Sequence, residues 1–69
     1  MKRRDLLQAI GQAARAHGRE WTLRRRGAEH EIWALDGREI AIPRYREIRE
    51  ITARAILRQL EAEFGKRWW

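Results

Sequence analysis

Residues 24–30, RRRGAEH, place one histidine after three arginines and a short turn. An imidazole exchanges a proton near neutral pH, whereas a guanidinium stays charged and binds phosphate oxygens bidentately. Such groups can cleave RNA without a metal ion: His30 would take the proton of a ribose 2′-hydroxyl while arginines stabilise the charge on the phosphorane. The spacing alone also fits a structural or incidental histidine, so the chemistry depends on where the fold places His30.

The other residue types narrow the possible chemistry. The chain contains no cysteine, which excludes disulfides, thiolate zinc sites and cysteine nucleophiles. Its two histidines, His17 and His30, are too few to suggest a metal cluster. His17 falls at the end of an expected helix, where a favourable interaction with the helix dipole explains it. We therefore expect neither a metal ion nor a small-molecule cofactor.

The charge of the chain points to a polyanionic partner. Its 69 residues include 16 Lys and Arg against 10 Asp and Glu, which gives a formal net charge of +6. Nucleic acid suits this excess, although an arginine-rich composition also arises in proteins from GC-rich genomes.

The basic N-terminus is like that of a signal peptide, but Asp5 and Gln8 interrupt its apolar stretch. With no segment near the roughly 20 apolar residues of a membrane span, we expect a soluble, cytoplasmic protein without membrane contact.

Apolar residues at helical spacing predict two helices. The first set precedes Gly18 and indicates a helix over residues 4–17. The second helix follows the polar connection RYREIRE, takes Thr52 as its N-cap and ends at Gly65. Its apolar stripe consists of Ala53, Ile56, Leu57, Leu60 and Phe64.

Between these helices the period changes to two, which predicts strands over residues 21–26, 29–35 and 38–42. The dipeptides Gly-Ala and Asp-Gly supply the turns, and the following proline ends the third strand. The fold class is then α+β, with the order α-β-β-β-α and two helices on one face of a three-stranded antiparallel sheet.

Residues 1–69 form a single domain. The tryptophans of its appended tail, residues 65–69, could complete the core, bind a partner or stay mobile.

Side-chain bulk decides which face of the second strand points inward. Trp33 and Leu35 belong to the core, which directs His30 to the bare face. The inward residues expected from the neighbouring strands are Trp21, Leu23, Ile40 and Ile42. The arginines expected around His30 are Arg24 and Arg26 on the same face, with Arg38 and Arg44 near its edges.

Three segments in order, RGAEH, DGREIAIPRYREI and TARAILRQL, resemble the HicA toxins of bacterial type II toxin-antitoxin systems. The resemblance covers nearly the whole chain and implies a fold like that of double-stranded-RNA-binding domains. HicA proteins show a Gly-Ser-x-His turn, a Val/Ile-Pro-x-His strand end and a closing helix of Thr-Leu-Arg-x-Ile-Leu type. The matching positions here are Gly27, His30, Ile42, Pro43, Thr52, Ile56 and Leu57.

The resemblance implies an mRNA interferase, a ribosome-independent endoribonuclease that arrests translation in a stress response, with His30 as its catalytic histidine. A HicB-type antitoxin would hold it inactive. The chain departs from the family pattern at three places. Ala28 replaces the usual serine, Glu29 replaces a common histidine, and Arg44 or Tyr45 stands where a histidine frequently follows the proline.

Three functions remain open. The first is a metal-independent RNase that cleaves single-stranded mRNA. The second is a non-catalytic RNA-binding module, in which arginines contact phosphates and His30 is a surface residue. The third is a basic surface for an acidic protein partner. For the RNase, the expected RNA contacts besides His30 are Arg24, Arg26, Gly27, Arg38 and Arg44.

Overall fold

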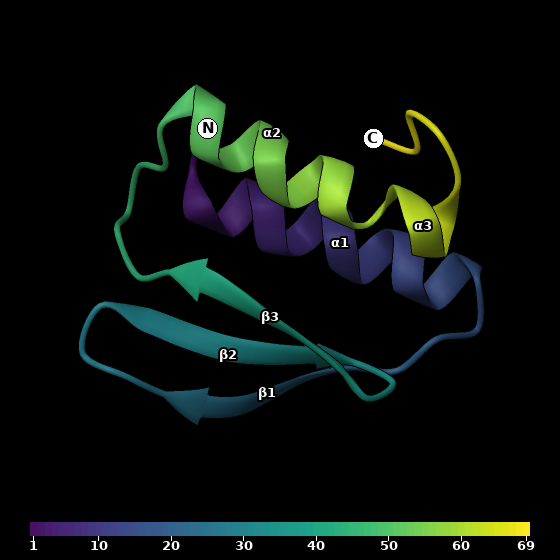
Figure 1. Cartoon of the computed structure of the whole chain (residues 1–69), viewed down its shortest axis with the longest axis horizontal. Helices are drawn as coiled ribbons and strands as arrows, with labels where there is room; N and C mark the ends of the chain where they lie inside the picture. The colour runs from purple at the N-terminus through teal and green to yellow at the C-terminus, as the bar shows by residue number, and fades with distance from the viewer.

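The computed structural model describes residues 1–69 and contains three helices and one three-stranded sheet. The helices lie together on one side of the sheet (Figure 1). The α+β class and the order α-β-β-β-α predicted from the sequence are confirmed. The elements are α1 (Arg3–Ala16), β1 (Trp21–Arg26), β2 (His30–Leu35), β3 (Arg38–Pro43), α2 (Glu50–Gln59) and α3 (Glu61–Phe64).

The sheet is antiparallel throughout, with the strand order β1-β2-β3. A loop of residues 27–29 closes the first hairpin, and the Asp36-Gly37 turn closes the second. Asp36 has a φ of 55°, a left-handed conformation that Asp tolerates better than most residues. Each strand boundary agrees with its predicted position within one residue, because alternation and turn dipeptides are local signals.

A core of twelve buried residues fills the space between the helices and the sheet. Its members are Leu6, Ile10, Ala14, Leu35, Ile40, Ile42, Ile48, Ala53, Ile56, Leu57, Leu60 and Phe64. All residues of the apolar stripe predicted for the second helix are therefore buried, but the single helix predicted to run to Gly65 is wrong, because α2 ends at Gln59 and a separate short α3 carries Phe64. Trp21 and Trp33 pack against this core with their rings stacked at a centroid distance of 5.0 Å. None of the helices has the length and apolar character needed to span a membrane.

The second helix begins earlier than predicted. Glu50 is the first residue of α2 and Arg49 is its N-cap, so the assignment of Thr52 as the cap is wrong. The preceding segment is held against the N-terminal residues, because the Ile48 N–H donates to the Met1 carbonyl oxygen at 2.8 Å. This tertiary contact fixes the chain two residues before Glu50, where the helix begins, and no local capping pattern reveals it.

The C-terminal tail folds back onto the helices. Gly65, with a φ of 99°, ends α3 and reverses the chain. Trp68 Nε1 then donates to the Leu57 carbonyl oxygen at 2.8 Å, and its ring meets that of Phe64 edge-on at 4.9 Å. Of the roles left open for the tail, Trp68 thus completes the core, whereas 46% of Trp69 is exposed.

An ion-pair cluster joins the α1–β1 connection, the second hairpin and α3. Arg19 donates from Nε to the Asp36 carboxylate and from Nη2 to Glu63 Oε1 at 2.7 Å. Arg38 Nη1 donates to Glu63 Oε2 at 3.0 Å. Hydrogen bonds from Arg19 and from the Glu20 N–H lower the pKa of Asp36, and those from Arg19 and Arg38 lower the pKa of Glu63. The cluster therefore requires both carboxylates to be ionised.

We expect this cluster to make the fold less stable in acid. Because both carboxyl groups have folded-state pKa values below their ordinary 3.8 and 4.5, the unfolded chain binds more protons as the pH falls. The stabilisation is complete above those ordinary values and is lost as the pH falls through the lower folded-state values. Urea midpoints measured from neutral to strongly acid pH test this. Glu63→Gln should weaken the pH dependence, whereas Glu39→Gln, at an exposed residue of β3, should preserve it.

Candidate functional site

His30 lies at the end of the sheet, as the first residue of β2 and opposite Pro43 of β3. Its side chain is exposed and lines a hollow of about 300 Å³, called the His30 hollow below. The other walls belong to the end of β3, the connection to α2 and the first turn of that helix. They are Pro43, Tyr45, Glu47, Ile48, Arg49 and Thr52. The imidazole is therefore accessible to a ligand, among side chains different from those expected.

The loop before His30 is held by backbone contacts and by Arg44. The Gly27 N–H donates to the His30 carbonyl oxygen at 2.8 Å, and a Cβ atom on Gly27 would lie 2.8 Å from that same oxygen. From the other side, the Arg44 N–H donates to the Glu29 carbonyl oxygen at 2.9 Å, and Nη1 donates to the Gly27 carbonyl oxygen at 2.7 Å. Gly27 and Arg44, which were expected to contact RNA, thus position the strand that begins with His30.

An irregular step in β1 separates the arginines that were expected beside His30. Leu23 lies opposite Trp33 but Arg25 lies opposite Ile32, so Arg24 is an extra residue in the ladder. Such a bulge reverses the alternation of the residues that follow it.

Arg26 consequently lies opposite the buried Glu31, with Nε at 3.5 Å from Glu31 Oε2. The expectation that Arg26 shares a face with His30 is therefore wrong. Arg24 is exposed, within the irregular step itself.

Arg38 lies at the opposite end of the sheet from His30. It is the first residue of β3 and pairs with Leu35, whereas His30 pairs with the last residue of that strand. Arg38 and Pro43 are five steps apart along β3, which places them about 17 Å from each other. The guanidinium of Arg38 is also bound to Glu63, so Arg38 does not reach a phosphate beside His30.

Three side chains of the His30 hollow were missed as site residues. Tyr45, of which 60% is exposed, adds a phenol hydroxyl. Arg49 adds a guanidinium and Thr52 a hydroxyl. The position of Tyr45 just after the proline, where HicA proteins often have a histidine, was a signal for it. No sequence signal linked the other two to His30, because they reach it only through the tertiary fold.

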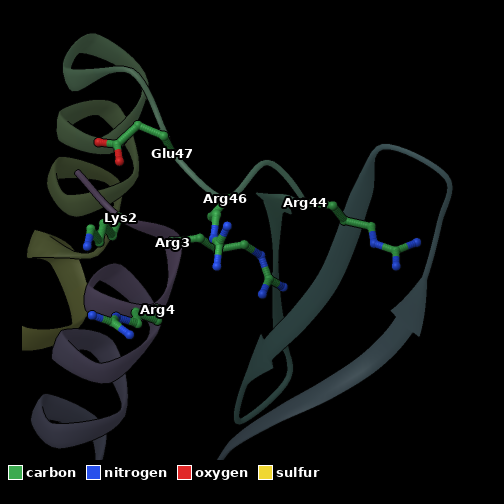
Figure 2. A pocket seen from close by; sticks show the side chains of 6 residues that line it. All are labelled: Lys2, Arg3, Arg4, Arg44, Arg46 and Glu47. Atoms are coloured by element: carbon green, nitrogen blue, oxygen red, sulfur yellow. The ribbon is translucent and has the colours of Figure 1, made fainter.

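A second hollow, of about 600 Å³, adjoins the first and is called the cationic hollow below. It is lined by Lys2, Arg3, Arg4, Arg44, Arg46 and Glu47. Figure 2 shows that these side chains come from the start of α1 and from the chain after β3, and that Arg44 extends away from the others. Glu47 also lines the His30 hollow, so the two hollows share this residue as a wall.

The cations of this hollow differ in their partners. Arg3 binds the Glu31 carboxylate, and Arg4 Nε lies 3.9 Å from Asp5 Oδ1. Lys2 and Arg46 have their side chains exposed and bound to no carboxylate. Cations gathered around one hollow repel one another, and a bound phosphate relieves that repulsion. Lys2 and Arg46 are thus the groups best placed to bind one.

Comparison of the chain with models of known families, with characterised proteins and with solved structures finds no match. The side chains of the His30 hollow supply an imidazole, a phenol, a hydroxyl, a guanidinium and the carboxylate of Glu47, which is paired with the Met1 ammonium at 3.0 Å. The guanidinium and the hydroxyl groups can bind a phosphate, and the imidazole can exchange a proton with a group beside that phosphate. No group of three or more His, Cys, Asp or Glu side chains is arranged to hold a metal ion.

Gly27→Ala should disturb the position of His30, because the new Cβ would lie 2.8 Å from a backbone oxygen. The strain should lower the free energy of unfolding by about 1–3 kcal/mol. It should also shift the NMR resonances of the His30 ring. Gly37→Ala is the matched control, since a Cβ there has no neighbour within 4 Å. Equal effects of the two substitutions on the His30 resonances would contradict the close approach at Gly27.

Proposed function

We propose that this chain binds single-stranded RNA and cleaves it with His30 as the general base, without a metal ion, as a HicA-type mRNA interferase. The observation that carries the proposal is that the His30 hollow and the cationic hollow lie on either side of one shared residue, Glu47. RNA phosphates bound by Lys2 and Arg46 would bring a neighbouring ribose beside an exposed imidazole. The α-β-β-β-α fold, shared with the family that the sequence resembles, supports the same proposal.

Cleavage proceeds by transfer within the RNA. His30 takes the proton of the 2′-hydroxyl, the 2′ oxygen forms a bond to the adjacent phosphorus, and the bond from phosphorus to the 5′ oxygen breaks. The leaving oxygen takes a proton from water, and the hydroxide that remains takes the proton held by His30, which restores the neutral imidazole. The products are a 2′,3′-cyclic phosphate and a 5′-hydroxyl end.

Arg49 is the cation that stabilises the phosphorane in this proposal, because it lines the same hollow as His30. Arg26 and Arg38 do not take this role, since their guanidinium groups are paired with carboxylates. The hydroxyl groups of Tyr45 and Thr52 are available to bind the remaining phosphate oxygens.

RNA binding without cleavage is the second candidate function, and one observation favours it. The hydrogen bonds around His30 go to its backbone and to the preceding loop, and none holds its imidazole. Catalytic bases are commonly oriented by a further side chain. A binding module would use the same cationic hollow and leave His30 as a surface residue.

As a toxin, the protein would act on mRNA in the cytoplasm and would require a HicB-type antitoxin. Such a partner would have to cover the two hollows. Acidic groups would complement Lys2 and Arg46, and an apolar group would pack on the exposed ring of Tyr45.

His30→Ala should slow RNA cleavage by about 10²–10⁴-fold, the usual contribution of one general base, and should abolish growth arrest. Affinity for RNA and the melting temperature should stay unchanged, because the side chain is exposed. His17→Ala is the matched control. It removes the other histidine, which caps α1 with its ring 5.2 Å from that of Phe64. Gel analysis of a short RNA incubated with each purified protein measures cleavage.

The same assay separates the two candidate functions. Wild-type cleavage should persist in EDTA, and RNA with a 2′-deoxyribose at the cut site should resist it, because the nucleophile is absent. If the wild-type protein binds RNA but never cuts it, or if His30→Ala cuts it equally fast, the non-catalytic role replaces the enzyme.

Lys2→Ala and Arg46→Ala should each make RNA binding less dependent on salt. Each lost phosphate contact lowers the magnitude of the slope of log affinity against log salt by about 0.7 for a single strand. Titrations of a labelled RNA with the His30→Ala protein at several salt concentrations give that slope. Arg15→Ala, at an exposed cation in the last turn of α1, is the matched control. Slopes that stay at the wild-type value in both test variants would place the RNA outside the cationic hollow.

A further inference from the structure

A third hollow, of about 510 Å³, lies between α2 and the C-terminal tail, and the proposed cleavage does not use it. In Figure 1 the tail turns back from α3 toward α2. The hollow is lined by Arg54, Arg58, Glu61, Lys66, Arg67 and Trp69. It therefore combines four cations, one carboxylate and a single aromatic ring; we call it the tail hollow.

Trp69 is held in this hollow by a chain of aromatic contacts. Its ring meets that of Trp68 at a centroid distance of 6.0 Å and an angle of 79°. Trp68 is itself tied to α2 by its hydrogen bond to Leu57 and packs on Phe64. Because 46% of Trp69 is exposed, the tail hollow presents an indole ring to solvent, and the ring of Trp68 packs beneath it. The contact with Trp68 orders the Trp69 ring in part before a ligand stacks on it, which reduces the ordering that binding requires.

The cations of the tail hollow are free for a ligand. Arg54 and Arg58 are four residues apart and so share one face of α2. Neither they nor Lys66 and Arg67 take part in any of the chain's ion pairs, which involve other cations. The carboxylate of Glu61 is occupied, because Oε2 accepts the backbone N–H of Arg67 at 3.0 Å. The hollow is consequently positive around an exposed indole.

We propose that the tail hollow binds an unpaired nucleotide of single-stranded RNA, with the base stacked on Trp69 and the flanking phosphates held by Arg54 and Arg58. Aromatic rings beside a cationic groove are how proteins bind single strands without reading their sequence. This site rests on the proposed RNA binding and does not depend on cleavage. It would give the RNA a second anchor, at a hollow that shares no lining residue with the His30 hollow, and so raise the occupancy of the first.

The shape of the tail hollow favours a nucleotide over an anionic membrane surface. A membrane-bound helix buries a row of apolar side chains. Trp69 is the single hydrophobic residue that lines this hollow. Its neighbours are cations arranged around a concave space, which suits a base and its phosphates and suits a flat lipid surface poorly.

Binding of a labelled oligothymidylate of about 12 nucleotides tests the proposal. This probe offers stacking bases and phosphates but no 2′-hydroxyl, so cleavage plays no part. Trp69→Ala should weaken binding by about 5- to 150-fold, the value of one stacked base, and leave the salt slope unchanged. Trp69→Phe should retain most of the affinity. Arg54→Ala and Arg58→Ala should each lower the magnitude of the slope by about 0.7.

Two controls match these variants. Ile51→Ala removes an exposed apolar side chain of α2 outside the tail hollow, and Arg15→Ala removes an exposed cation of α1; both should bind as the wild type does. The melting temperature of Trp69→Ala should stay unchanged, because Trp68 supplies the contact with the core.

The outcomes distinguish the two proposals. Wild-type affinity in Trp69→Ala, with binding lost in the Lys2→Ala Arg46→Ala protein, overturns the tail site and leaves the proposed function intact. Weakened binding in Trp69→Ala, with wild-type affinity in Lys2→Ala Arg46→Ala, supports the tail site and removes the RNA path to His30. Trp69-dependent binding to vesicles of anionic lipid, without binding to the oligonucleotide, assigns the hollow to a membrane and overturns the inference.

Discussion

The buried carboxylate of Glu31 is the constraint on which the candidate site depends. Only 6% of Glu31 is exposed, and a carboxylate so far removed from water is costly unless it is paired and hydrogen-bonded. Arg3 of α1 and Arg26 of β1 pair with it, and Trp33 Nε1 donates to it at 3.1 Å. Arg3 also donates from Nε to the Pro43 carbonyl oxygen at 2.9 Å. One carboxylate and two guanidinium groups thereby join α1 to all three strands, at the end of the sheet where β2 begins.

Many of the arginines of this chain fall into two groups with different physical roles. Those of the first group, such as Arg3 and Arg19, neutralise carboxylates and connect elements that are distant in the sequence. Those of the second group, such as Arg46 and Arg54, lie around hollows without a carboxylate partner. A net charge alone does not distinguish the two groups. Most of the cations without a carboxylate partner therefore lie around these hollows and at the exposed Arg24 and Arg25 of β1, and do not form a single basic sheet face.

Local patterns predicted the elements and the core but not the surroundings of the candidate site. Helical spacing identified the buried faces of α1 and α2, and alternation with turn dipeptides identified the strands, because each signal involves residues a few positions apart. The irregular step at Arg24 depends on how two strands align, and no single strand shows it. The walls of the His30 hollow also depend on the tertiary fold, since Arg49 and Thr52 come to line the same hollow as His30 only when α2 packs on the sheet. The early start of α2 was likewise missed, because its N-cap makes no side-chain capping bond and the segment before it is bound to the distant Met1.

The irregular step in β1 also bears on how copies of this chain behave when they are concentrated. β1 is an edge strand whose sheet partner is β2 alone. An open edge offers unpaired N–H and C=O groups to a strand of another molecule, which is a route to aggregation. The extra residue at Arg24 breaks the regular spacing of those groups, and the run of arginines would place like charges side by side in any such pairing. The segment that first suggests an RNA ligand thus also disfavours strand pairing between molecules at the β1 edge of the sheet.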